Sequence, residues 1–232
     1  LVNVHGLLFQ IRIPRKQISH LLRYQVKNIS VRLEERKVQT RLISYSQPAD
    51  GLYVGEDIQE LISYCARVSN PSNQMNSETS TKLLQYLIKH KHWSPFEMVS
   101  ACVEVETTRD IARQLLRHRS FSFQEFSQRY ADPTNDLSFV TREARLQDPK
   151  NRQNSIETEN VDLHHAWLDQ QIKVIDAAKE AYKWAIENGI AKEQARAVLP
   201  EGNTVSRLYV NGTIRSLVHY IELRSGHGTQ IE

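Results

Sequence analysis

Residues 159–188 limit the possible folds more than any other stretch of the sequence, because they predict one long amphipathic helix. Their apolar positions are spaced by three or four residues, as one side of an α-helix requires. These positions are Leu168, Ile172, Ile175, Ala178, Tyr182 and Ala185. Gly189 follows, where glycine commonly ends a helix. We expect the apolar side to pack in the domain core or, alternatively, against another subunit.

Shorter periodic segments surround this helix. Three predicted strands, recognised by β-type composition or alternating apolar residues, are Val38–Ser46, Val99–Val105 and Thr204–Val210. Helical spacing predicts helices at 56–68, 190–198 and 214–224. Two further helices are predicted, one that begins after a cap at Ser77 or Thr79 and one that begins at Thr107 or Thr108. Turns are predicted at 47–51 and at Asn211-Gly212. Strands and helices therefore mix along the chain.

Composition narrows the class of protein. A chain of 232 residues with net charge +3 suits one sizeable domain, and the charge does not by itself predict nucleic-acid binding. No apolar run approaches membrane-spanning length. Cys65 and Cys102 are too few for a disulfide framework, so we expect buried thiols and a cytoplasmic protein.

Residues 1–37 form a basic N-terminal segment. It holds eight Lys or Arg against two Glu, a net charge of +6. A nucleic-acid arm and a peripheral extension are both open, so its role stays undetermined. Because the sequence starts at Leu1, we expect a trimmed chain.

The stretch from Arg117 to Tyr130 concentrates polar chemistry. Arg117, His118 and Arg119 are consecutive, so they cannot share one side of a regular element. If the following segment is extended, Glu125, Ser127 and Arg129 lie on one side of it. This arrangement predicts a pocket for an anionic ligand, since Arg grips phosphate or carboxylate bidentately. An exposed basic loop that closes a helix is the alternative.

Two neighbouring segments bear on the same pocket. Gln114 and Arg117 are three residues apart and therefore share one side of a helix. His90 and His92 lack a third ligand at suitable spacing, so we predict no metal site. A helix end followed by a Ser-Pro turn is the simpler interpretation there.

Several motifs together resemble flavin-dependent thymidylate synthases. The resemblance covers about Val38–Glu232, which we take as the enzyme domain, with residues 1–37 as an extension. The motifs are Arg-His-Arg-x-x-Ser-x-x-Glu-x-Ser-x-Arg-Tyr at 117–130, His-x-Ser-Pro-Phe-Glu at 92–97, Ala-Arg-x-x-Leu-Pro at 195–200, and Arg-Ser-Leu with Leu-Arg at 215–217 and 223–224. Separate blocks in the right order make a chance match improbable.

The resemblance implies both fold and reaction. The fold would be α+β, a mixed or antiparallel twisted sheet flanked by helices with one long helix, and it would assemble as a homotetramer with sites shared between subunits. The reaction would convert dUMP to dTMP with a one-carbon unit from methylenetetrahydrofolate. FAD, reduced by NADPH, would supply the hydride.

The resemblance also implies roles for individual residues. Arg224 would be catalytic, stabilising the deprotonated uracil N3 and so enriching C5 in electrons. The residues implied for FAD are His92, Ser94, Arg117, His118, Arg119, Glu125, Thr213, Arg215 and His219. Those implied for dUMP are Gln114, Arg117, Glu125, Phe126, Ser127, Gln128, Arg129, Arg196 and Arg224.

The sequence departs from the family pattern at three places. Thr213 replaces a frequent Asn, Gly228 replaces a frequent His with His227 displaced by one, and Gln124 replaces a frequent Asn. Two other hypotheses stay open: an inactive relative that binds flavin or nucleotide only, and a nucleic-acid-binding module that uses residues 1–37.

Overall fold

The structure is a computed structural model that describes residues 39–52 and 57–225, all within residues 34–232, one of the two units into which the chain divides. The predictions for residues 1–37, Gly228 and His227 lie outside the described residues. Within them the fold is α+β, as predicted. None of the described helices is long and apolar enough to cross a membrane.

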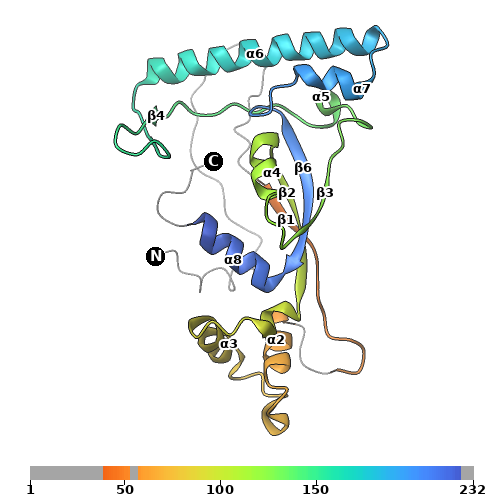
Figure 1. The fold of residues 1–232 in the computed structure, drawn as a ribbon, viewed down its shortest axis with the longest axis vertical. Helices are drawn as coiled ribbons and strands as arrows, with labels where there is room; N and C mark the ends of the chain where they lie inside the picture. Colours follow the sequence, from red (N-terminus) through yellow and green to blue (C-terminus); the bar gives the residue numbers. More distant parts are fainter. Residues whose placement is uncertain (1–38, 53–56, 226–232) are drawn as a thin grey trace, which may run out of the picture. The chain divides into compact units, whose positions relative to one another are not determined.

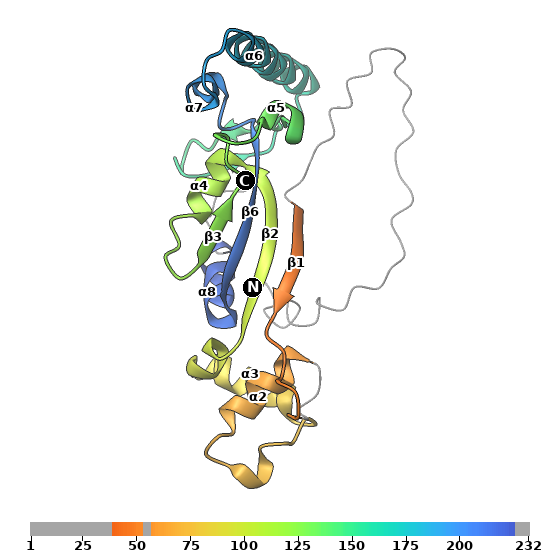
Figure 2. The same ribbon diagram turned by 90° about the vertical axis from the view of Figure 1, so that its right-hand side faces the viewer.

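A four-stranded sheet forms the centre of this unit (Figures 1 and 2). Its order is β1 (Gln39–Tyr45), β2 (Ser100–Thr108), β6 (Val205–Thr213) and β3 (Ser122–Glu125). All three neighbouring pairs are antiparallel, which settles the mixed-or-antiparallel alternative for these strands. A second, two-stranded ribbon joins β4 (Leu146–Gln147) to β5 (Ser155–Ile156).

Helices flank the sheet and its ends. They are α2 (Ile58–Ala66), α3 (Ser80–Lys89), α4 (Arg109–Leu115), α5 (Pro133–Asp136), α6 (Val161–Glu187), α7 (Lys192–Ala195) and α8 (Ile214–Arg224). Short 3₁₀ turns occur at Pro71–Asn73, Ser94–Glu97 and Arg196–Val198. The predicted helices are confirmed, with their ends shifted by a few residues, as terminal fraying commonly produces.

The long helix α6 follows the prediction closely. Asn160 caps it by accepting from the Leu163 backbone N–H at 3.0 Å, and Gly189 ends it with φ of 78°. Its buried side consists of Gln171, Ile175, Ala178, Tyr182 and Ala185. The apolar seam therefore lies in the domain, where its C-terminal half packs against α7.

The predicted turn at Asn211-Gly212 is wrong. Both residues lie inside β6, opposite Cys102 and Ala101 of β2. Glycine is needed here for close packing, because a Cβ at position 212 would lie 2.4 Å from Cδ1 of Phe121. The dipeptide typical of turns therefore marks the place where an aromatic ring meets the strand backbone.

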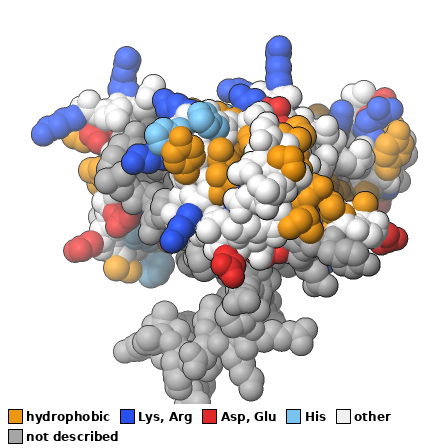
Figure 3. Space-filling view, turned by 90° about the horizontal axis from the view of Figure 1, so that it is seen from below, with side chains coloured by type: hydrophobic (Ala, Val, Ile, Leu, Met, Phe, Trp, Pro, Cys, Tyr) orange, Lys and Arg blue, Asp and Glu red, His pale blue; other side chains and the backbone are white. Residues whose placement is uncertain are grey.

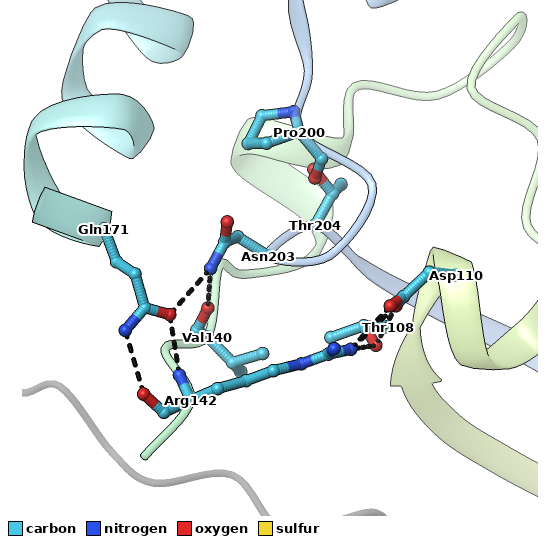
Figure 4. A network of polar contacts seen from close by, with 8 residues as sticks. All are labelled: Thr108, Asp110, Val140, Arg142, Gln171, Pro200, Asn203 and Thr204. Carbon is cyan, nitrogen blue, oxygen red and sulfur yellow. Dashed lines mark hydrogen bonds and ion pairs between the residues drawn. The ribbon is translucent and has the colours of Figure 1, made fainter. Parts of the chain in front are cut away.

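A polar network anchors the start of α4 (Figure 4). The Arg142 guanidinium donates to Asp110 at 2.8 and 2.9 Å and to Thr108 at 3.0 Å. The Arg142 backbone N–H donates to Gln171 Oε1 at 2.8 Å, and Gln171 Nε2 donates back to the Arg142 carbonyl. Asn203 donates to the same Gln171 oxygen at 3.2 Å. The network thus ties α4, α6 and the turn before β6 together.

This network predicts a pH-dependent stability. Burial favours a higher pKa for Asp110, but hydrogen bonds from Thr108 and Arg142 and the Arg142 charge outweigh it and lower the pKa. A lowered folded-state pKa stabilises the fold above the unfolded value of about 3.9, and this contribution is lost as the pH falls through the folded value. Arg142→Met should cost about 1.5–3 kcal/mol at neutral pH.

The measurement is urea unfolding of the wild-type protein and of the Arg142→Met variant between about pH 3 and 7, the range in which a carboxyl group titrates. We expect the stability difference to shrink toward the acid end, because Asp110 takes up a proton there, first in the unfolded chain. Lys183→Met is the control, because it removes an exposed pair with Glu187 on α6 that should contribute no more than about 0.5 kcal/mol. A pH-independent difference for Arg142→Met would contradict the role given to Asp110.

Candidate active site

Two sequence motifs meet at the start of α8. Glu97, which closes the 3₁₀ turn Ser94–Glu97, forms an ion pair with Arg215 of α8. The Trp93 ring meets His219 edge-on with centroids 4.4 Å apart. Phe96 is fully buried in a core cluster that also contains Ile214 of α8. Motifs separated by more than a hundred residues in sequence are therefore adjacent, as the resemblance implies.

His92 and Ser94 both present polar groups at the surface. Both are exposed, and the His92 ring lies 6.1 Å from Tyr86 and 6.2 Å from His90. Seen from below, histidine side chains lie beside hydrophobic and basic ones (Figure 3). This surface offers stacking rings together with hydrogen-bonding groups.

Thr213 has a structural contact that the sequence did not reveal. Its hydroxyl oxygen accepts from the Ser216 backbone N–H at 3.2 Å and so caps α8. The Asn side chain that the resemblance leads us to expect at this position also caps helices well. The departure from the family pattern therefore preserves the start of the helix.

Arg224 and His118 come together at the other end of α8. Arg224 Nε and Nη2 lie 3.3 and 3.2 Å from His118 Nε2. Burial and the nearby Arg224 charge lower the pKa of His118, and Tyr220 packs edge-on at 4.8 Å. Because guanidinium is only a donor, His118 Nε2 must accept, which requires a neutral ring. The Arg224 side chain is exposed, and its described contact is with the uncharged His118 nitrogen.

The remaining residues of the Arg-His-Arg motif follow α4. The Arg117 backbone N–H donates to the Gln114 carbonyl at 3.3 Å, which continues the helical turn past Leu115. Arg117 and Arg119 are exposed, and Gln114 is half-buried. Both guanidinium groups are therefore accessible to a ligand.

A second group of predicted residues lies beyond β3. The extended conformation considered for 125–129 does not continue to Arg129, because β3 ends at Glu125 and a turn follows over 128–130, with the Ser127 carbonyl accepting from Tyr130 and Ala131. Within this turn Gln128 is buried, with only 4% of its surface exposed. Its Nε2 has no hydrogen-bond partner among the described residues.

Two cations of this second group converge on α7. Arg129 Nε lies 3.7 Å from the Glu193 carboxylate, and Arg196 Nε donates to the Glu193 carbonyl at 3.2 Å. Both side chains are at least partly exposed. They form a pair of guanidinium groups near one point of the surface, which suits a phosphate.

The second group and the start of α8 lie toward opposite ends of β6. Glu125 is opposite Leu208, whereas Thr213, which starts α8, is five residues further along the strand. At about 3.3 Å per residue the separation is roughly 16 Å, and Arg196 precedes the strand altogether. Figure 2 shows α7 and α8 at these two ends. The pair Arg129 and Arg196 is therefore distant from the residues at the start of α8.

Other features of the surface do not coincide with these groups. A cavity of about 470 Å³ is lined by residues of α2, α3 and the loop between them, including Arg67, Asn70 and Lys82, and by none of the predicted site residues. Among the described residues, no cluster of three His, Cys, Asp or Glu side chains has the arrangement of a metal site. Cys65 and Cys102 are free and partly buried.

Sequence reasoning missed several neighbours of the predicted residues. Arg109 and Ser206 contact the Glu125 carboxylate, and Tyr220 packs on His118. Helical periodicity places Tyr220 on α8 but does not indicate what it touches. The contact of Ser206 with Glu125 depends on the pairing of β3 with β6, which single-segment patterns do not specify.

The antiparallel sheet with guanidinium groups at both ends defines an α+β protein suited to an anionic ligand with polar edges, such as a nucleotide. The chain matches the family described as Thymidylate synthase complementing protein over residues 51–232. With this match and the relatives described next, the chain belongs to the flavin-dependent thymidylate synthase family.

Two relatives and one solved structure illustrate the similarity. The probable flavin-dependent thymidylate synthase of Paramecium bursaria Chlorella virus 1 is 49% identical over 196 residues, 84% of this chain and 88% of that protein. The flavin-dependent thymidylate synthase of Synechocystis is 48% identical over 198 residues, again 84% and 88%. The UMP/dUMP methylase PolB of Streptomyces cacaoi, solved with 5-Br UMP, superimposes with a TM-score of 0.66 at 28% identity, covering 81% of this chain and 76% of PolB.

Proposed function

We propose that this chain converts dUMP to dTMP with bound FAD, and that methylenetetrahydrofolate and NADPH are its co-substrates. The observation that carries the proposal is the meeting of three separate motifs around α8, through the contacts of Arg215 with Glu97 and of Arg224 with His118. Membership of the family supports the same reaction.

The exposed cations near α8 fit a flavin dinucleotide. Arg117, Arg119 and Arg215 offer guanidinium groups for its pyrophosphate, and His92 and His219 offer rings and ring nitrogens. Ser94, His118, Glu125 and Thr213 complete the set that we propose for FAD. When bound and reduced by NADPH, the flavin supplies the hydride of the reaction.

The dUMP residues divide by chemistry. Arg129 and Arg196 suit the phosphate, and Gln114, Ser127 and Gln128 have the donors and acceptors that uracil edges require. Phe126 lies beside them and Glu125 offers a carboxylate. Arg117 and Arg224 belong to the other group, around α8 and the segment that follows α4. We therefore propose that the site forms between subunits of a homotetramer, where one chain supplies each group.

Arg224 would act on the uracil ring. Its charge favours the deprotonated form of N3, which raises the electron density at C5 and so its nucleophilicity. The neutral His118 contributes here, because it orients Arg224 without cancelling its charge. A carboxylate in place of His118 would compete with the uracil anion for the same guanidinium.

The extent of the enzyme domain is part of the proposal. We assign residues 38–232 to catalysis and residues 1–37 to a basic extension whose role is open. The cytoplasmic location expected from Cys65 and Cys102 also stays a prediction.

The test begins with the visible spectrum of the purified protein. We expect a flavin band that is bleached by NADPH and dTMP formation that requires dUMP and methylenetetrahydrofolate together. Each substrate is omitted in turn as the control. A protein that binds added FAD but forms no dTMP under any condition would refute the enzymatic proposal and favour an inactive flavin-binding relative.

A further inference from the structure

We infer that Arg109 and Ser206 are positioning residues that hold one oxygen of the Glu125 carboxylate and leave the other to accept a hydrogen bond from a bound ligand. Glu125 Oε1 accepts from the Ser206 hydroxyl at 2.7 Å and from Arg109 Nη1 at 3.4 Å. The inference rests on the proposed function, because it deepens the role of Glu125 in the same site.

Strand pairing places Ser206 beside Glu125. Glu125 is opposite Leu208 in the β3–β6 register, and Ser206 is two residues before Leu208, so the three side chains share one side of the sheet. Ser206 is fully buried on the central strand. Its hydroxyl is therefore a fixed donor, and the bond to the carboxylate is shielded from water.

The network around Arg142 holds the backbone at Arg109 in place. The Arg109 backbone N–H donates to the Thr204 carbonyl at 3.0 Å. Its neighbours Thr108 and Asp110 are both held by the Arg142 guanidinium (Figure 4). Arg109 thus extends from an anchored helix start, with a side chain only 15% exposed. Because the backbone at Arg109 is held in place and its side chain is mostly buried, the guanidinium group stays beside Glu125 Oε1.

The second carboxylate oxygen is the part that we assign to the ligand. The contacts from Arg109 and Ser206 are both to Glu125 Oε1, and the side chain is 22% exposed, so Oε2 is reachable. An ionised carboxylate accepts strongly from N–H and O–H donors. Flavin and dUMP both carry such donors, and the experiment distinguishes between them.

The test uses binding as well as turnover. Ser206→Ala removes the hydroxyl with almost no change in volume, and we expect the Kd of the ligand that Glu125 holds to rise about 3–10-fold, as loss of part of a charged hydrogen bond predicts. Flavin content per chain and calorimetric titration with dUMP show which ligand is affected. Arg109→Met should act on the same ligand, and Arg109→Lys should restore part of its affinity.

A double-mutant cycle separates positioning from a purely structural effect. Glu125→Gln replaces one carboxylate oxygen by an amide nitrogen, so it should weaken the ligand about 10-fold or more. If Ser206 acts through Glu125, Ser206→Ala should add little in the Glu125→Gln protein. If the increase in Kd of the double variant equals the product of the two single increases, the inference is overturned.

Arg113→Met is the matched control on the same helix. Arg113 pairs with Glu201 at the surface, with side chains 57% and 43% exposed, and should leave both Kd values unchanged. If the wild-type chain is active and Ser206→Ala, like Arg113→Met, leaves both Kd values unchanged, the positioning role alone is refuted. A wild-type chain that binds both ligands without forming dTMP would refute the proposed function alone, and one that binds neither would refute both.

Discussion

Arg224→Ala should lower kcat about 10²–10³-fold while the protein keeps its flavin, the size of effect seen when one charge-stabilising donor is removed from an active site. Arg224 lies at the end of α8 and is exposed, so its loss should not disturb the core. Its described partner is His118, at 3.2 Å from Nη2. The variant therefore removes a charge that we assign to the uracil anion.

Two further measurements distinguish this role from simple loss of structure. Arg224→Lys keeps a charge without the planar fork, so we expect an activity between that of Arg224→Ala and the wild type. The pKa of His118, followed by NMR, should rise in Arg224→Ala, because the nearby charge that helps to lower it is gone. Wild-type turnover by Arg224→Ala would contradict the catalytic role, whatever happens to His118.

Periodicity was enough to predict the elements that bury one side. The long helix α6, the helix α8 and the strand β2 follow apolar spacing that tertiary contacts reinforce. The sequence led to a wrong prediction where a residue has a role other than its commonest one. Asn211-Gly212 is a frequent turn dipeptide, but here the strand continues, because the absent Cβ admits the Phe121 ring.

The candidate site could be predicted in part. The motifs indicated which residues carry polar chemistry, and the contact of Arg215 with Glu97 agrees with that reading. Sequence patterns did not reveal that Arg129 and Arg196 lie beyond one end of β6, whereas Arg224 contacts His118 from the end of α8. That division depends on the order and register of four strands, which arise from long-range pairing.

Gly212→Ala should destabilise the fold by about 1–3 kcal/mol, as overpacking of a filled core does. The new Cβ would lie 2.4 and 2.8 Å from two carbons of the Phe121 ring and 3.5 Å from the Ser120 carbonyl oxygen. The ring is 8% exposed in a cluster with Ala112, Leu115, Leu208 and Val210, so it has little space to move.

The thermal midpoint of Gly212→Ala should fall by about 2–12 °C for a chain of this size. Gly202→Ala is the matched control, because its nearest heavy atom, Asp110 Oδ2, is an ordinary 3.9 Å away, and we expect a change of no more than about 0.5 kcal/mol. Phe121→Leu, which shortens the clashing side chain, should cost less in the Gly212→Ala protein than in the wild type. Equal costs in the two proteins would mean that the ring is not what requires glycine at this position.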